Sequence, residues 1–144
     1  MLITKETDYA LRILRSLSDG GSFTVGELTE KEQLPREFAY KILKKLEKAG
    51  MVQIIRGAKG GCFLDCDLNE ISLYDVIHSI ETKTKISACM DPGYDCNWRK
   101  EKNASCLIHG RLRMVQEAVD TELKSWSIFH VIHGMGETDE AILN

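Results

Sequence analysis

The segment from residue 34 to residue 66 limits the fold of this chain more than any other part of it. Pro35 suits the first turn of a helix, because its missing N–H has no intrahelical partner there, and Gly50 suits the left-handed residue that ends one. A stretch rich in Val and Ile follows, then a turn at residues 57–61 with three glycines, then a second strand-like stretch. The pattern predicts a helix that leads directly into a β-hairpin.

The predicted helix has an apolar back and a basic front. Its inward stripe consists of Ala39, Ile42, Leu43 and Leu46. Residues 34–61 contain seven basic and two acidic residues, a local charge of +5, whereas the whole chain carries −3. Any binding to nucleic acid must therefore come from this local basic face.

Further helices are predicted on both sides of this segment. Apolar residues recur at helical spacing from Lys5 to Ser18, and a Thr with a Glu three residues later forms a capping box that opens a short helix over residues 24–32. A Ser and an Asp with the same spacing open another helix at residue 72. We expect a mainly α fold with a small β wing, in which residues 1–82 form a winged helix-turn-helix domain.

The remaining residues divide into a loop and a long helix. Residues 83–106 lose periodicity and contain three cysteines, which predicts an irregular loop. Residues 107–144 form a helix and tail, and the helix, over Leu107–Ile132, would be ~39 Å long at 1.5 Å per residue. Its apolar stripe is Ile108, Leu112, Val115, Val119, Leu123 and Trp126. This stripe predicts a homodimer in which the two long helices pack together.

We expect the basic helix to enter the major groove of DNA and the hairpin to follow the backbone or the minor groove. The candidate DNA-binding residues are Arg36, Glu37, Phe38, Tyr40, Lys41, Lys44, Arg56, Lys59 and Gly60. Most of the cations suit phosphate contacts, Arg36, Glu37 and Tyr40 suit base edges, and Arg56 and Lys59 suit a narrow minor groove. The alternative is a solvated basic face without a ligand.

Five cysteines cannot close completely into intramolecular disulfides. Cys62 and Cys66 lie in the second strand pattern and are interpreted as packing residues, with a redox role as the alternative. Cys89, Cys96 and Cys106 have six and nine residues between them, and His109 follows three positions after the last. Three thiolates with one N or O ligand suit an iron–sulfur cluster, either 2Fe–2S or 4Fe–4S. Unliganded thiols and a zinc site are the two alternatives.

Three stretches resemble the Rrf-type regulators, the family that includes IscR, NsrR and CymR. They are TDYALR at residues 7–12, LEKAGMV at 46–52 and RGAKGG at 56–61. The resemblance covers nearly the whole chain and implies a dimeric bacterial transcription regulator, in which several members hold an iron–sulfur cluster before the dimer helix. It also implies a rival to His109 as fourth ligand, because an aspartate matching Asp8 of the partner subunit completes the cluster in the NsrR branch.

The leading hypothesis is a regulator that senses iron, oxygen, nitric oxide or redox state through the cluster and binds a pseudo-palindromic operator in double-stranded DNA. A cluster-free regulator controlled by thiol chemistry or by an enzyme partner is the second hypothesis. A metal-dependent enzyme is disfavoured, because no catalytic constellation accompanies the candidate ligands. The acidic N-terminus and the lack of a run of ~20 apolar residues predict a cytoplasmic protein without a membrane partner.

Overall fold

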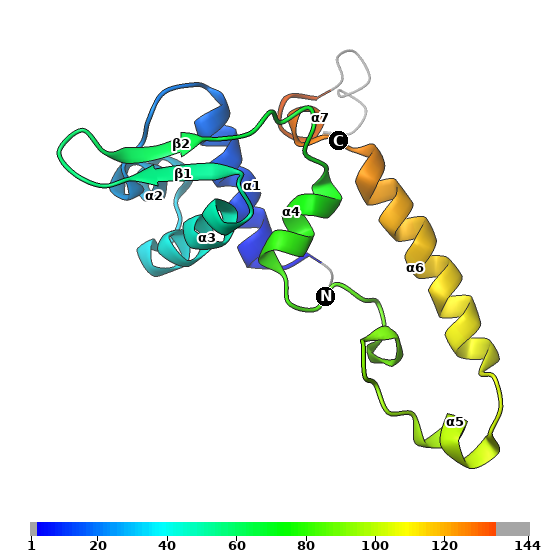
Figure 1. Ribbon diagram of the computed structural model, residues 1–144. Helices are drawn as coiled ribbons and strands as arrows, with labels where there is room; N and C mark the ends of the chain where they lie inside the picture. Colours follow the sequence, from blue (N-terminus) through cyan, green and yellow to red (C-terminus); the bar gives the residue numbers. More distant parts are fainter. Residues whose placement is uncertain (1–2, 135–144) are drawn as a thin grey trace.

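The computed structural model describes residues 3–134, which form a group of short helices with a β-hairpin at one side and a long helix projecting at the other (Figure 1). The elements are α1 (Lys5–Ser18), α2 (Val25–Glu32), α3 (Arg36–Lys48), β1 (Val52–Ile55), β2 (Gly61–Leu64), α4 (Leu73–Ile80), the 3-10 turn η1 (Ala88–Met90), α5 (Asn97–Lys102), α6 (Leu107–Ser125) and α7 (Ile128–His133). The strands are antiparallel, with Val52 opposite Leu64. The predicted mainly α fold with a β wing is confirmed.

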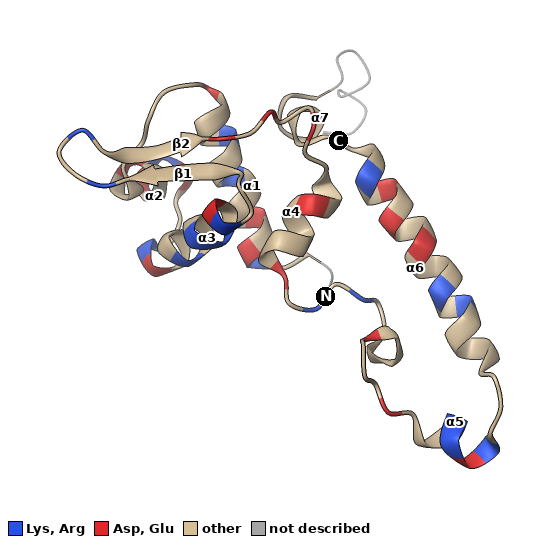
Figure 2. Cartoon of the chain, viewed as in Figure 1, with Lys and Arg blue, Asp and Glu red and all other residues tan. Residues whose placement is uncertain are grey.

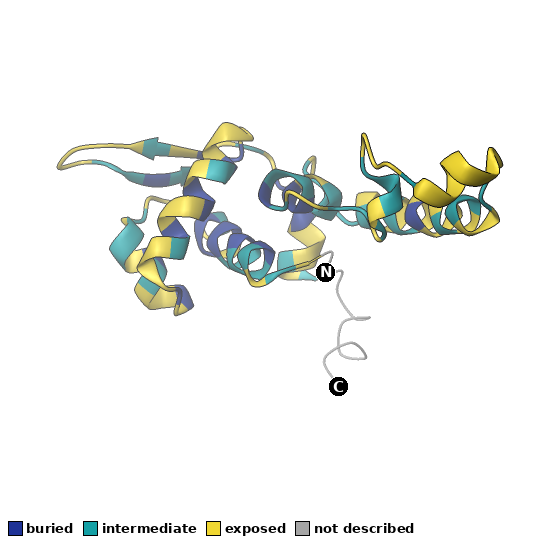
Figure 3. Ribbon diagram, turned by 90° about the horizontal axis from the view of Figure 1, so that it is seen from below, coloured by how far each residue is buried: buried dark blue, intermediate teal, exposed yellow. Residues whose placement is uncertain are grey.

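Helix α1 lies at the centre of the core because apolar side chains recur along one side of it. Ala10, Ile13, Leu14 and Leu17 are buried, and α2, α3, α4 and β2 all pack around them. Burying each Leu or Ile stabilises the fold by about 1.5–3 kcal/mol. The buried residues concentrate in this body, whereas α5 and most of α6 are exposed or half-buried (Figure 3).

Local capping signals account for several helix ends. Thr24 and Ser72 both form complete capping boxes, as predicted, at the starts of α2 and α4. Gly50 follows α3 with φ +72°, a backbone conformation that L side chains rarely adopt. Pro35 occupies the N-cap of α3, one position before the predicted first turn.

The predicted length of the last helix is wrong. Helix α6 ends at Ser125, and α7 begins at Ile128 after Ser127 caps it by accepting a hydrogen bond from the His130 N–H. The backbone of the break pairs with the chain before α4: the Leu73 N–H donates to the Trp126 carbonyl, and the Ile128 N–H donates to the Ile71 carbonyl, both at 2.8 Å. Ile128, at the start of α7, is completely buried in the core.

The loop and the apolar stripe also differ from expectation. Residues 83–106 are not wholly irregular, since they contain η1 and α5. On α6, Leu112, Val119 and Leu123 are half-buried, and the helix packs against α4. An exposed apolar stripe remains on α6, made of Ile108 and Val115 from the predicted stripe and of Leu107 and Met114 beside them. Within residues 3–134, no helix has the length and apolar character needed to cross a membrane.

Candidate DNA-reading surface and cysteine pocket

Helix α3 separates its apolar and basic residues as the sequence predicts. Its inward stripe is buried in the core. The exposed residues of α3 are Arg36, Glu37, Tyr40, Lys41, Lys44, Glu47 and Lys48. Lys and Arg are prominent along α3 and at the tip of the hairpin in Figure 2. The two elements expected to contact DNA therefore both present cations to solvent.

Phe38 is the one candidate of α3 that is also a packing residue. Its ring meets Tyr9 of α1 edge-on, with 6.0 Å between the ring centroids, and packs against the hydrophobic core. It also lines a shallow surface pocket with Glu37 and Lys41. The structure thus gives Phe38 a role in holding α3 against α1.

The hairpin tip depends on its glycines. Gly57 has φ +111°, and a Cβ on Gly60 would lie only 2.1 Å from the backbone oxygen of Ile55. The Gly60 N–H closes the turn by donating to the Gly57 carbonyl at 2.9 Å. This tight turn leaves Arg56 and Lys59 exposed on the tip.

The contact of Glu6 with two lysines of α3 is not predicted from the sequence. Glu6, in the first turn of α1, accepts hydrogen bonds from Lys41 Nζ at 2.6 Å and from Lys45 Nζ at 2.7 Å. These bonds hold the pKa of the Glu6 carboxyl below its ordinary value. The spacing of the two lysines shows that they share a helix face, but nothing in the sequence shows that Glu6 meets that face.

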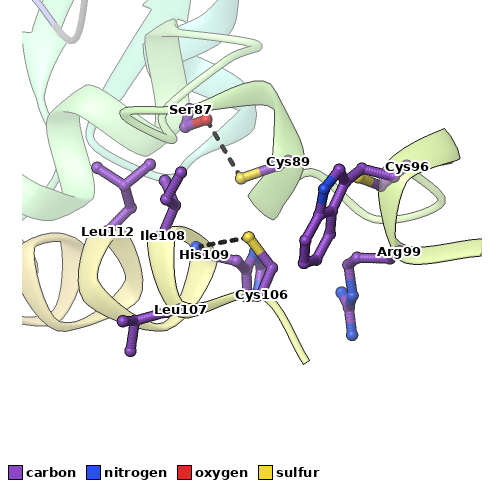
Figure 4. A pocket seen from close by; sticks show the side chains of 10 residues that line it. Ser87, Cys89, Cys96, Arg99, Cys106, Leu107, Ile108, His109 and Leu112 are labelled. Carbon is purple, nitrogen blue, oxygen red and sulfur yellow. Dashed lines mark hydrogen bonds between the residues drawn. The ribbon is translucent and has the colours of Figure 1, made fainter. Parts of the chain in front are cut away.

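The three loop cysteines line one pocket of about 470 Å³ between the loop and α6 (Figure 4). Cys89 comes from η1, Cys96 is the N-cap of α5, and Cys106 is the N-cap of α6, with His109 in the next turn. The rest of the lining is Ser87, Trp98, Arg99, Leu107, Ile108 and Leu112. The fold therefore brings to one place three thiols from three different elements, with six and nine residues between them in the sequence.

The polar groups of the pocket are one imidazole and three thiols with few partners among the described residues. Nδ1 of His109 is buried and, within the described residues, has no hydrogen-bond partner. Two sulfurs already have partners, because the His109 backbone N–H donates to Cys106 Sγ at 3.4 Å and the Ser87 hydroxyl lies 3.3 Å from Cys89 Sγ. Across residues 3–134, no three His, Cys, Asp or Glu side chains are close enough together to hold one metal ion. The thiols share the pocket without converging on a point.

Asp8 does not join the cysteine pocket of its own chain. Its carboxylate forms an ion pair with Arg12 at 2.9 Å, one turn further along α1. Asp8 lines a different pocket, together with Arg15, Val131 and Ile132. Of the five candidate ligands, the structure therefore brings together the three cysteines and His109.

The wing cysteines agree with their interpretation as packing residues. Cys62 is buried in the core and Cys66 packs partly against it. Burial raises the pKa of both thiols, which keeps them in the protonated, unreactive form.

The arrangement of three helices, a basic third helix and a basic hairpin defines a winged helix-turn-helix protein, the class in which the third helix reads DNA. The family model Rrf2, described as an iron-dependent transcriptional regulator, matches residues 3–134. The chain therefore belongs to the Rrf2 family of transcriptional regulators.

Similar proteins agree with this assignment. The protein aau3 of Rhizobium meliloti (strain 1021) is 30% identical over 131 residues, which span 89% of this chain and 82% of aau3. CymR, the global cysteine regulator of B. subtilis, superimposes with a TM-score of 0.68 at 20% identity, covering 94% of this chain and 98% of CymR. T. potens IscR gives 0.62 at 18% identity, covering 98% and 90%. At these identities the two structures show that the fold is shared.

Proposed function

We propose that this chain is a homodimeric transcriptional regulator that binds an iron–sulfur cluster in the cysteine pocket and changes its affinity for operator DNA with the state of the cluster. The observation that carries the proposal is that one pocket is lined by Cys89, Cys96, Cys106 and His109. The iron-dependent description of the family supports it.

The donor set fits a cluster. Thiolates are the preferred ligands of iron–sulfur clusters, and an imidazole nitrogen is an accepted replacement for one of them. His109 supplies a buried Nδ1 without a partner among the described residues, whereas Asp8 is already paired with Arg12. We therefore favour His109 as the fourth ligand, with Asp8 of a second copy as the alternative. The bound cluster would be the group that responds to iron supply, oxygen, nitric oxide or redox state.

The DNA-reading residues follow from the exposed faces of α3 and the hairpin. Lys44 and Lys59 are exposed and suit phosphate contacts, which give affinity without sequence preference. Glu37 and Tyr40, near the start of α3, suit base edges in the major groove. The exposed apolar stripe of α6 suits the same stripe of a second copy, and such a dimer would bind a pseudo-palindromic site.

The segment between α4 and the pocket supports a route for the signal. It begins beside α3, where Lys45 Nζ donates to the Ile80 carbonyl at 2.6 Å, and it reaches α6, where the Ile86 N–H donates to Gln116. Ligands on this loop and on α6 would order the segment when the cluster is bound. Cluster loss would release it and change the spacing of the two reading helices.

Anaerobic reconstitution with iron and sulfide tests the cofactor directly. We expect visible absorption, with iron and sulfide both bound to the protein. Changing Cys89, Cys96 and Cys106 together to serine should abolish both, whereas Cys62→Ser, in the wing, should leave them unchanged. A wild-type protein that holds neither iron nor visible colour after anaerobic reconstitution contradicts the proposal.

Cluster-free control by thiols is the second candidate function. It is favoured by the lack, within residues 3–134, of three side chains already close enough to bind a metal ion. Oxidation of the pocket thiols would then change operator affinity in iron-free protein, and iron would have no effect.

A further inference from the structure

Two lysines on the reading helix are paired with a carboxylate before any DNA is present. Glu6 Oε1 accepts from Lys41 and Glu6 Oε2 accepts from Lys45, so both oxygens of one carboxylate are used. The Glu6 side chain is only 21% exposed and that of Lys45 only 26%, whereas Lys41 is 57% exposed. Glu6 and Lys45 are thus partly withdrawn from solvent, whereas Lys41 is accessible to it.

The backbone of Glu6 is held in place by the chain around it. Thr4 caps α1 by accepting a hydrogen bond from the Glu6 N–H at 3.1 Å. The Thr4 hydroxyl in turn donates to Glu81 at 2.6 Å, and the Thr7 hydroxyl donates to the same oxygen. The first turn of α1 is therefore fixed to the Glu81 C-cap of α4, and the backbone that carries the Glu6 side chain is held beside α3.

A carboxylate and a DNA phosphate interact with a lysine in the same way. Each offers anionic oxygens that accept hydrogen bonds from an ammonium group, and each is strengthened by the opposite charge. Lys41 lies on the exposed front of α3, one residue from Tyr40 and three from Lys44. A phosphate that approaches this front competes with Glu6 for the charge and the N–H donors of Lys41.

We infer that Glu6 competes with DNA phosphates for Lys41 and Lys45 and so weakens the binding of duplexes that lack the operator sequence. The inference rests on the proposed DNA binding by α3. Phosphate contacts supply nearly all of non-specific affinity, so a built-in competitor for two cations acts on that part of binding first. Base contacts by Glu37 and Tyr40 are left intact, and Glu6 thereby raises the ratio of specific to non-specific binding.

The test compares Glu6→Gln with Glu30→Gln, which removes the same charge from an exposed position on α2. Binding to a duplex of unrelated sequence is measured over a series of salt concentrations. We expect Glu6→Gln to bind roughly three- to tenfold more tightly at low salt than Glu30→Gln, as expected for freeing two partly exposed pairs. The slope of log affinity against log salt should steepen by about 1–2, since each phosphate contact adds about 0.9.

A double variant tests whether the effect depends on Lys41. Adding Lys41→Gln to Glu6→Gln should reverse about one unit of the gained slope. Equal affinities and slopes for Glu6→Gln and Glu30→Gln overturn the inference while the proposed function stands. If wild-type protein with its cluster state defined binds no duplex at any salt concentration, the proposed function itself fails.

Discussion

The backbone N–H of Ile86 donates a hydrogen bond of 2.8 Å to the side-chain oxygen of Gln116, which ties the chain just before Cys89 to the middle of α6. Gln116 is buried, and its amide nitrogen donates to Asp120 at 2.6 Å. The side chain is therefore held at both ends. One wall of the cysteine pocket is fixed to α6 by this contact.

Gln116→Leu should loosen that wall. The substitution keeps much of the side-chain volume but leaves the Ile86 N–H without its acceptor, at a local cost of about 1–3 kcal/mol. We expect faster hydrogen exchange at the amides of residues 86–90 and faster loss of a reconstituted cluster. Gln53→Leu, at an exposed position of β1, is the matched control. Equal exchange rates in the two variants would show that Gln116 does not anchor the loop.

The buried carboxylate of Glu32 should make stability depend on pH. Burial opposes its ionisation, but hydrogen bonds from Arg15 and Ser16 outweigh burial and lower the Glu32 pKa. A lowered folded pKa contributes stability above the ordinary value of about 4.3, and the contribution is lost as the pH falls through the folded value. Glu32→Gln should reduce the free energy of unfolding by about 1–3 kcal/mol near neutral pH.

Urea unfolding at neutral and at acid pH measures this difference. The gap between wild type and Glu32→Gln should shrink as the pH falls below about 4. Glu30→Gln, on the exposed side of α2, should show little gap at either pH. A gap for Glu32→Gln that stays constant into the acid range would mean that the charge of Glu32 is not the stabilising feature.

The exposed stripe of α6 should hold the dimer. Met114 is 57% exposed and Val115 is 51% exposed, and neither lines the cysteine pocket. Changing both to Glu would place unpaired charges in the interface, so light scattering should show a monomer where the wild type is a dimer. Arg113→Glu reverses a charge on a different side of the same helix, the same net change of −2 as the double variant, and should remain dimeric. If the wild type is a monomer, or if the Met114→Glu/Val115→Glu variant remains a dimer, this stripe does not form the dimer interface.

Substitutions of phosphate-contacting lysines and of base-contacting residues should have different effects on DNA binding. Lys44→Gln and Lys59→Gln should each reduce the salt slope by about one and weaken binding to all sequences alike. Tyr40→Phe and Glu37→Gln should leave the slope unchanged and alter sequence preference, measured by selection from random duplexes. Lys102→Gln, in α5, is the control for net charge. A reading surface elsewhere is indicated if Lys102→Gln lowers the slope as much as Lys44→Gln does.

Local signals explain why much of the fold is predictable from the sequence. Capping boxes at Thr24 and Ser72 act within four residues, and the glycine after α3 acts within one turn, so they are visible without tertiary structure. The apolar stripes of α1 and α3 are visible for the same reason. The loop cysteines lie within 18 residues of one another, and the last of them is the N-cap of α6, so their gathering beside His109 also follows from short separations along the chain.

The features that escape prediction depend on contacts between distant segments. The apolar helical pattern runs through Trp126, and the chain breaks there because residues 126–128 pair with residues 71–73 and Ser127 caps a new helix. The contacts of Glu6 with Lys41 and of Ile86 with Gln116 join residues 35 and 30 positions apart. Neither has a spacing signature, because each depends on how whole helices pack.

Operator affinity measured with and without the cluster on one preparation tests the central claim most directly. The operator is first selected from random duplexes by the reconstituted protein, and binding is then measured anaerobically before and after cluster removal. We predict a change in affinity within the range of about 5- to 150-fold typical of coupled sites, and no change in the Cys89→Ser/Cys96→Ser/Cys106→Ser variant. Identical affinity of the loaded and cluster-free wild type for the same selected duplex would contradict the account.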